Sequence, residues 1–419
     1  MFSLIANLPS QVSEFIQQFS SPRPPSEGPC SPLSILECSN ILRSISDDSE
    51  LVFELCKMAT SKDPSSCADL AIPVDYAILD KLYGVPGDCS TYRTRNMVKG
   101  FLLRLIHGGR CNRLPSSLYL YDVVFHSESD KILSGSADIY KGSNANGLLA
   151  LKYLRSNTSA VRTQESIMDE LAHEVLIWAD LDHPHIYRLL GIVPSRLENH
   201  PGDFMASSWM EKGDLSSHMK ELHEHPYPEF LKRATRVLSQ VAQAIKYCHE
   251  HGVVHGDIRG VGYLIQRAST LTQPSPQVNV LIDGNENAYL SDFGSATLLG
   301  VHNFRGIETR KGNIKSSAPE LHTSAEEPSF ACDVYSFAML CIEVFLSRPL
   351  FYDWRDVAII MEIANRKSTP PIPKDTGHRM PKELKALVNS CRQHCPSSRP
   401  SISEVVERMK IISEANQPR

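Results

Sequence analysis

Three segments between residues 114 and 154 have the residue pattern of β-strands, and long segments with helical periodicity follow them. The strand-like segments are LYLYDVVF, ILSGSADIYKG and GLLALKYL, which are rich in β-branched and aromatic residues and separated by Gly and Ser. Helical spacing begins in ESIMDELAHEVLIWADL and returns after a second β-rich region, VVHGDI and NVLIDGNENAYLSDFG. Strands first and helices later predict an α+β fold with two lobes.

The residues before this region form two further parts. Residues 21–32, SPRPPSEGPCSP, contain five prolines, so residues 1–32 are predicted to be a flexible terminus and linker. Apolar residues then recur at helical spacing in three segments, which predicts a helical extension over residues 33–113. This extension has no catalytic signature, and we interpret it as a part that packs on its neighbour or recruits a partner of unknown identity.

Composition excludes several classes of protein. Of the 419 residues 42% are hydrophobic, which is enough for a sizeable core, and 43 Lys and Arg against 48 Asp and Glu leave a net charge of −5. This balance provides no basic field, so we expect no nucleic-acid partner and no membrane partner. The 11 cysteines have no paired spacing, as in a reduced intracellular protein. We therefore expect a cytoplasmic protein, with the nucleus as the alternative.

Charged residues that could bind phosphate or its counter-ion occur in a specific order along the chain. Lys152 ends an apolar strand, and Glu174 lies on the next helix, where a carboxylate could face back towards the lysine. Asp257, in His-Gly-Asp, and Asp292, in Asp-Phe-Gly, each follow a strand, and Ala-Pro-Glu ends at Glu320. Each motif alone is weak, because a single Asp in a loop is more often a cap or turn residue. In this order, the motifs match the signature set of a protein kinase.

On these motifs, residues 114–412 resemble a protein kinase catalytic domain of the tyrosine-kinase-like group and are similar to kinases of mushroom-forming fungi. Further matching segments are LDHPHIYRLLGI, MASSWMEKGDL, DVYSFA and CPSSRPS. The resemblance implies a bilobal kinase fold with a small β-rich N-lobe, a larger helical C-lobe and a hinge near Trp209 to Leu215. It also implies ATP and Mg²⁺ as cofactors and a protein as substrate.

The resemblance also implies roles for individual residues. Lys152 would bind the α- and β-phosphates and be oriented by Glu174, while Asp292 would hold Mg²⁺. Asp257 would act as the base, and Arg259 would steady the γ-phosphate with its forked cation. The other residues implied to contact the nucleotide lie on the covering loop, the strands and the hinge: Ser134, Gly135, Ala137, Ile139, Ala150, Ser207, Trp209 and Met210.

Three further residues have implied structural roles. Glu320 and Arg399 match a structural ion pair that supports the activation segment, and Asp333 matches the residue that braces the catalytic loop. Ser207 falls at the gatekeeper position, where a short side chain would leave the back pocket open.

The nucleotide-covering loop departs from the pattern G-x-G-x-x-G. With Ile139 as its last residue, Ile132, Ser134 and Ala137 occupy the three glycine positions, and Gly135 is displaced by one. Small residues at two of these positions still let backbone N–H groups approach phosphates. The sequence therefore predicts a weakened loop.

A second departure is Gly256, which replaces the Arg that usually precedes the catalytic Asp. The cation that receives an activation-loop phosphate is thus missing. We do not expect phosphorylation of Thr309, Ser316 or Ser317 to switch the chain through that contact.

The third departure separates the second metal ligand from the base. Five positions after Asp257 the family pattern requires Asn, and this chain has Gly262. Removing the 17 residues Val261–Gln277 joins HGDIRG to VNVLID and brings Asn279 into register as the second Mg²⁺ ligand. The removed codons, 51 nucleotides, can begin with GT and end with CAG. Residues 261–277 are therefore either a retained intron or gene-model error, or a genuine loop insertion, which would form an exposed excursion.

Two functions remain open at this point. An ATP-dependent Ser/Thr kinase is favoured by the retained Lys152, Glu174, Asp257 and Asp292, and HGDIRG lacks the alanine-rich loop of tyrosine kinases. The alternative is a catalytically impaired pseudokinase that acts as a signalling scaffold, which the weakened glycine loop and the interrupted catalytic loop favour.

Overall fold

The computed structural model describes residues 80, 83, 92–107, 113–127, 131–133, 137–155, 164–195, 202–260, 278–299, 301, 314–323, 328–346, 358–359, 361 and 378–415. The chain divides into two compact units. The first is Met1–Tyr119, Thr158–Leu176 and Leu298–Phe304, and the second is Leu120–Asn157, Ile177–Thr297 and Arg305–Arg419. The predicted segments 1–32 and 261–277 lie outside the described residues, and the predicted domain boundaries remain predictions.

Helices dominate the described part of the first unit. These are α6 (Tyr92–His107) and most of α7 (Gln164–Trp178), with the short helix η2 (Ser116–Leu118). Val98, Leu102 and Ile106 recur every fourth residue along α6 and are all buried, as the helical periodicity of the extension predicts. At the end of α6, His107 Nδ1 lies 3.1 Å from the carboxylate of Asp169 on α7.

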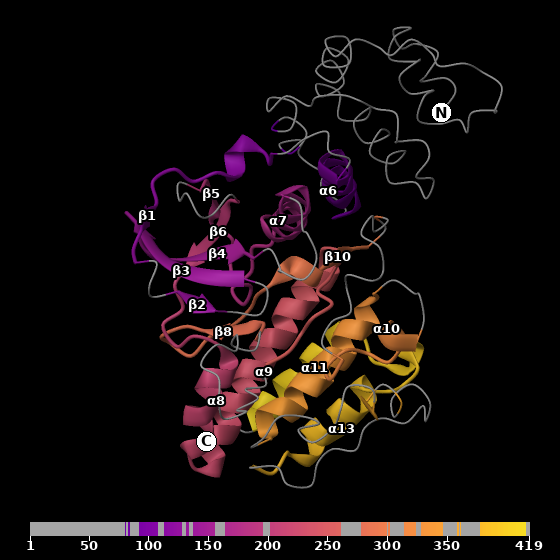
Figure 1. Cartoon of the computed structure of the whole chain (residues 1–419). Coiled ribbons are helices and arrows are strands. Elements are labelled where there is room, and N and C mark those ends of the chain that lie inside the picture. The colour runs from indigo at the N-terminus through magenta and orange to yellow at the C-terminus, as the bar shows by residue number, and fades with distance from the viewer. Residues whose placement is uncertain are drawn as a thin grey trace, which may run out of the picture. The chain divides into compact units, whose positions relative to one another are not determined.

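The second unit begins with an antiparallel sheet whose strand order is β1-β3-β4-β6-β5, with β2 paired to β3 (Figure 1). Its strands are β1 (Val124–Phe125), β2 (Ile132–Leu133), β3 (Ala137–Asn144), β4 (Gly147–Leu154), β5 (Gly191–Val193) and β6 (Phe204–Ser208). Leu149, Leu151 and Tyr153 alternate along β4 and point into one core. Phe204 is fully buried in that core, with its ring centroid 5.1 Å from that of Tyr153.

Helices form most of the rest of the second unit, and Figure 1 shows them below the sheet. They are α8 (Leu215–Glu224), α9 (Tyr227–Glu250), α10 (Glu320–Thr323), α11 (Phe330–Phe345), α13 (Lys382–Cys391), η6 (Pro396–Ser398) and α14 (Ile402–Ala415). Every residue of α11 from Cys332 onward is buried, because the helix is apolar on all sides and packs against α9 and α13.

Short strands connect these helices with the functional loops. They are β7 (Val253–Val254), β8 (Val280–Ile282), β9 (Ala288–Leu290) and β10 (Thr297–Leu298), which form the pairs β8–β9 and β7–β10, and the turn η4 (Phe293–Ser295). The order of a sheet followed by helices confirms the predicted α+β class. Among the described residues, no helix combines the length and the apolar character needed to cross a membrane.

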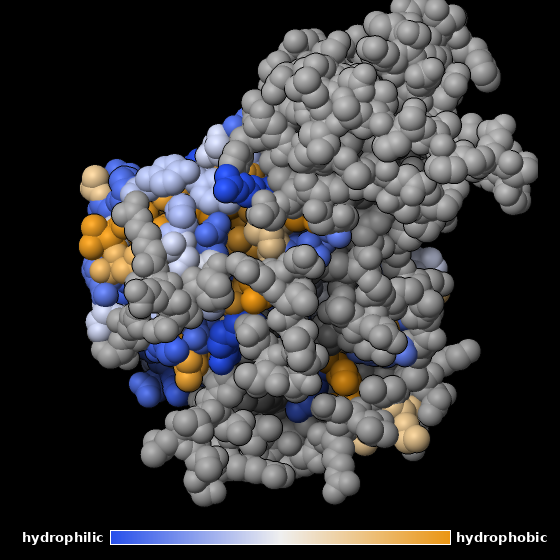
Figure 2. Space-filling model, turned by 45° about the horizontal axis from the view of Figure 1, so that its top comes forward, coloured by the Kyte–Doolittle hydropathy of each residue, from blue (hydrophilic) through white to orange (hydrophobic). Residues whose placement is uncertain are grey.

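Three strands of the sheet carry hydrophobic side chains at the surface. Figure 2 shows hydrophobic residues at the left edge of the molecule, over the sheet. Val124 on β1, Ile132 on β2 and Leu148 on β4 are 63%, 49% and 48% exposed. Val124 and Leu148 are both Cα partners of Ser143, so they lie on the same face of the sheet.

Candidate functional site: a loop and a hairpin that bring two aspartates together

Asp333, on the buried helix α11, holds the loop that carries Asp257. The Asp333 carboxylate accepts hydrogen bonds from the backbone N–H groups of His255 and Gly256, both at 2.9 Å. It also accepts a hydrogen bond of 2.8 Å from Nε2 of His249 at the end of α9. Asp333 has no exposed surface, and a buried carboxylate is stable only with such partners. The predicted bracing role therefore corresponds to contacts in the structure.

Gly256 has a backbone conformation that suits glycine. Its φ is +77°, and a Cβ atom added there would lie 2.9 Å from the carbonyl oxygen of Ser295. A larger residue at this position would be strained by both the conformation and the close approach. Of the three hydroxyl residues considered for phosphorylation, Ser316 and Ser317 are buried, and Thr309 lies outside the described residues.

Asn279 lies directly beside Asp257. Its backbone N–H donates to the carbonyl oxygen of Arg259 at 3.0 Å. Its side-chain amide donates to the carbonyl oxygen of Asp257 at 2.6 Å and to Oδ2 of Asp257 at 2.9 Å. The chain thus continues from Arg259 to Asn279 with the spacing expected after removal of residues 261–277. The origin of that segment, intron or insertion, remains a prediction.

One hairpin connects Asn279 with Asp292. Asn279 precedes β8 and Asp292 follows β9, and Val280 pairs with Leu290 across the two strands. The N–H of Ser291 donates to the carbonyl oxygen of Asn279 at 2.9 Å, which continues the pairing beyond the strands. Because the two ends of a hairpin meet, residues 13 apart in sequence come to the same place.

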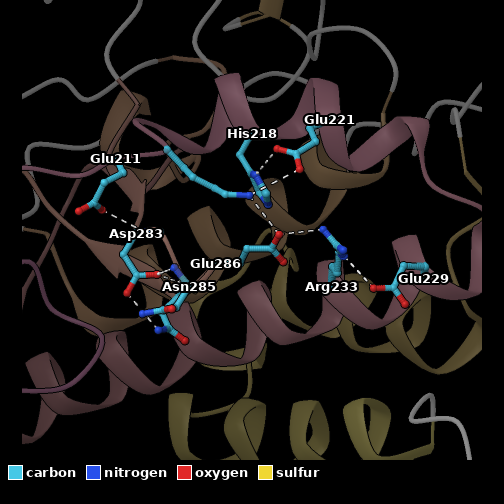
Figure 3. Close-up of polar contacts among 11 residues, drawn as sticks. Glu211, His218, Glu221, Glu229, Arg233, Asp283, Asn285 and Glu286 are labelled. Atoms are coloured by element: carbon cyan, nitrogen blue, oxygen red, sulfur yellow. Dashed lines mark hydrogen bonds and ion pairs between the residues drawn. The ribbon is translucent and has the colours of Figure 1, made fainter.

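A network of charged groups holds the turn of this hairpin, as Figure 3 shows. Glu286 accepts hydrogen bonds from Lys212 at 3.1 Å and from Arg233 on α9 at 2.8 Å. Asp283 accepts from two backbone N–H groups within the turn, and Glu211 accepts from a third. The turn is therefore tied both to the segment that follows β6 and to α9.

Lys152 forms an ion pair with Asp292. Lys152 Nζ lies 3.0 Å from Oδ1 of Asp292, and both side chains are largely buried. Burial alone would raise the pKa of Asp292, but the charge and hydrogen bond of Lys152, together with the charge of Arg259, bring this pKa below its usual value. Asp292 is therefore held as a carboxylate. Asp292 has a φ of 64°, an uncommon conformation for a residue other than Gly.

The pKa of Asp257 is shifted in the opposite direction. Burial raises it, and the positive charge of Arg259, whose guanidinium lies 3.0 Å from Oδ2 of Asp257, opposes that effect only in part. The nearby charge of Asp292 raises the pKa of Asp257 further. Two neighbouring aspartates are thus poised for different roles.

Oxygen atoms that could hold Mg²⁺ together with phosphates lie beside Asp257. Oδ1 of Asp257 is buried and, among the described residues, has no hydrogen-bond partner. No group of three or more His, Cys, Asp or Glu side chains in the described ranges could hold a metal ion alone. Mg²⁺ is commonly held by one or two carboxylates together with substrate phosphates, and the oxygens of Asp292 and Asn279 fit that pattern.

The remaining predicted site residues lie on the sheet and just after it. Ile139 and Lys152 are Cα partners, as are Ala150 and Ser207, so all four side chains face the same side of the sheet. Trp209 follows β6, and Nζ of Lys141 lies 4.6 Å from the centre of its ring. Residues 209–214, including Met210, connect β6 with α8 where the hinge was predicted.

The other four predicted residues are Ala137, Ser134, Gly135 and Glu174. Ala137, at the start of β3, is buried, and Ser134 and Gly135 lie outside the described residues. Glu174, on α7, is buried and falls in the first unit. Its orientation of Lys152 therefore stays a prediction.

Glu320 and Arg399 form the predicted structural ion pair. Two guanidinium nitrogens of Arg399 contact the two carboxylate oxygens of Glu320 at 2.6 and 2.8 Å. Cys332 Sγ also donates to Glu320, at 3.2 Å. Burial would raise the pKa of Glu320, but its contacts with Arg399 lower it below the usual value. The pair is thus a fully charged, bidentate contact.

Sequence patterns missed two residues that support the loop. Glu343, on α11, accepts a hydrogen bond of 3.1 Å from the N–H of Gly260, and His249 contacts Asp333 as described above. The signal for Glu343 is a carboxylate in the otherwise apolar stretch SFAMLCIEVF, because a buried charge needs a specific partner. His249 has no comparable signal in the sequence.

The sequence is similar to known proteins. The family model described as the protein kinase domain matches residues 134–409. The chain is 26% identical over 332 residues to the human serine/threonine-protein kinase TNNI3K, covering 78% of this chain and 35% of the relative. It is 29% identical over 289 residues to the Arabidopsis thaliana mitogen-activated protein kinase kinase kinase ANP1, covering 66% and 38%.

A third relative is the Dictyostelium discoideum dual specificity protein kinase zakA, which is 25% identical over 283 residues, covering 66% of this chain and 33% of the relative. The chain therefore spans less than two thirds of the length of these curated relatives. The finer resemblance to kinases of mushroom-forming fungi stays a prediction.

We predict that Arg399→Leu lowers the free energy of unfolding by about 3–5 kcal/mol, because it leaves the carboxylate of Glu320 poorly paired. The matched control is Arg233→Leu. Its ion pairs are partly solvent-exposed, so the expected loss is about 1 kcal/mol or less. Denaturant unfolding of both variants checks this. Equal losses of unfolding free energy in the two variants would contradict a larger contribution of the Glu320–Arg399 pair to stability.

Proposed function

Because this chain belongs to the protein kinase family, we propose that it transfers the γ-phosphoryl group of ATP to Ser or Thr hydroxyl groups of protein substrates. One observation carries the proposal. Lys152 on β4, Asp257 in its loop, and Asn279 and Asp292 at the two ends of one hairpin meet in one place, although 17 residues separate Gly260 from Val278. Phosphoryl transfer depends mainly on positioning and on charge neutralisation, and these side chains supply both.

Lys152 and Asp292 would receive the triphosphate and its cation. The ammonium group of Lys152 would bind phosphate oxygens, and the carboxylate of Asp292, with the amide oxygen of Asn279, would hold Mg²⁺. The bound cation would neutralise charge on the phosphates. Before the nucleotide arrives, the ion pair of Lys152 with Asp292 keeps both charged groups in place.

Asp257 would accept the proton of the substrate hydroxyl group. Its Oδ2 is held by Asn279 and Arg259, and its Oδ1 is the atom that remains for a hydroxyl donor. The raised pKa makes this carboxylate a stronger base than an ordinary aspartate. Arg259, beside it, would steady the γ-phosphoryl group.

The alternative, a scaffold without phosphoryl transfer, is supported by the covering loop. Ile132 pairs directly with Ile139 across β2 and β3, at one of the positions where the family pattern has glycine. A branched side chain keeps backbone N–H groups further from phosphates than glycine does. Two of the relatives named above are a serine/threonine-protein kinase and a dual specificity protein kinase, which favours an enzyme with Ser/Thr substrates.

We predict that Lys152→Met and Asp292→Asn each abolish phosphoryl transfer in an assay with Mg²⁺ and ATP. Each change removes a charge that would contact phosphate or metal. The matched control is Asp138→Asn. Asp138 lies on β3 and pairs with Lys131 at 3.1 Å and Arg155 at 3.2 Å, outside the site, so turnover should persist. Turnover equal to the parent in the first two variants would show that the roles are misassigned.

We predict that the acid limb of the kcat/KM profile reports Asp257 and lies above the usual aspartate pKa of 3.8, because burial raises the pKa of this base. Protonation below that pKa removes the proton acceptor, so the rate falls as the pH falls. Arg259→Gln removes a cation that lowers this pKa, and the limb should move to higher pH. Arg259→Lys, which keeps the charge, should move it less. A limb that moves to lower pH in Arg259→Gln would disprove the assignment.

We predict that a chain lacking Val261–Gln277 turns over ATP faster than the full chain. In the full chain, the contact between Arg259 and Asn279 closes a long loop, which costs a few kcal/mol of entropy. An ångström of misplacement in a metal ligand costs about 100-fold in rate. The two proteins should be prepared in parallel and their turnover compared. Equal turnover would identify residues 261–277 as a harmless natural loop.

A further inference from the structure

Ser207 has a short side chain on the face of the sheet that carries Lys152. It is the Cα partner of Ala150 on β4, and Met205, two residues earlier, is the partner of Lys152. Partners across antiparallel strands point to the same face. So short a side chain is expected to leave the space behind it open. In the structure, however, Ser207 is only 3% exposed.

The side chain of Tyr187 ends next to Ser207. Its hydroxyl group donates to the carbonyl oxygen of Ser208, the residue after Ser207. Burial raises the pKa of Tyr187, and the neighbouring hydroxyl group of Ser207 acts against this rise. The phenol therefore ends against residues 207 and 208, with its ring in the interior.

The backbone of Tyr187 is held on two sides. Its N–H donates to the carbonyl oxygen of Leu290 at 2.8 Å, on the strand that leads to Asp292. Its carbonyl oxygen accepts a hydrogen bond from Nε1 of Trp178, and the two rings lie 5.9 Å apart. Trp178 in turn stacks on Phe293, next to Asp292, at 6.0 Å. These contacts hold Tyr187 in place between β6 and the segment that carries Asp292.

We propose that Tyr187 is a specificity-determining residue of the nucleotide site, because its ring fills the space that Ser207 would otherwise leave open. The proposal rests on the proposed function for its ligand, ATP. The site then accepts an unsubstituted adenine and excludes adenine nucleotides that carry a bulky aryl group. Tightly packed interiors have few voids, so the parent has no space for such a group. Removal of the ring would create that space.

The packing is tested without any nucleotide by a double-mutant cycle of Ser207→Met and Tyr187→Val. Ser207→Met should lower the melting temperature of the parent, because it adds volume where the tyrosine ring already lies. In the Tyr187→Val background the same change should lower it less or raise it. The matched control is Ser208→Met, at an exposed position, which should have a small effect in both backgrounds. Additive effects of Ser207→Met and Tyr187→Val would overturn the proposal.

The specificity is tested by binding of ATP and N6-benzyl-ATP to the parent, Tyr187→Val and Tyr187→Phe. The ratio of the two Kd values should shift towards the benzyl analogue by about tenfold or more in Tyr187→Val. Tyr187→Phe keeps the ring and loses the hydroxyl group, so its ratio should stay close to that of the parent. Equal ratios in the parent and Tyr187→Val would overturn the proposal. A parent that binds neither nucleotide would contradict the proposed function, and the melting cycle would then decide the packing of Tyr187 alone.

Discussion

The position of the candidate site depends on a single buried carboxylate, Asp333. A charge inside an apolar helix is stable only with well-formed hydrogen bonds, and Asp333 obtains two of its bonds from the backbone of His255 and Gly256. His255 then extends the connection, because its Nε2 bonds to the carbonyl oxygen of Ser291 at 3.0 Å and its ring packs 5.0 Å from that of Phe293. The loop that carries Asp257 and the segment that carries Asp292 are therefore both positioned from α11.

Two aspartates of the same intrinsic chemistry acquire different properties from this arrangement. Burial raises the pKa of both aspartates. At Asp292 the nearby cations, Lys152 above all, more than offset this rise. At Asp257 the charge of Arg259 offsets it only in part, and the charge of Asp292 raises the pKa further. The pKa of Asp292 is consequently low and that of Asp257 is high. A carboxylate that stays negative can bind a cation, and one with a raised pKa can accept a proton.

Sequence patterns predicted the order of strands and helices and the residues at the ends of strands, because local periodicity and short motifs reflect local backbone structure. Asn279 could be predicted as well, since the motif text resumes after residue 277. The contacts of Tyr187, His249 and Glu343 could not be predicted in this way. Their contacts join residues far apart in the chain, and such contacts depend on how side chains pack in three dimensions.

Asn279 and Asp292 stand at the two ends of one hairpin, whereas Lys152 belongs to a different sheet. A rigid-body movement of the hairpin would leave the separation between Asn279 and Asp292 unchanged. The same movement would lengthen or shorten the contact between Lys152 and Asp292. The hairpin therefore fixes the spacing of two oxygen-bearing side chains, whereas the distance from Lys152 to Asp292 depends on how the two sheets are placed.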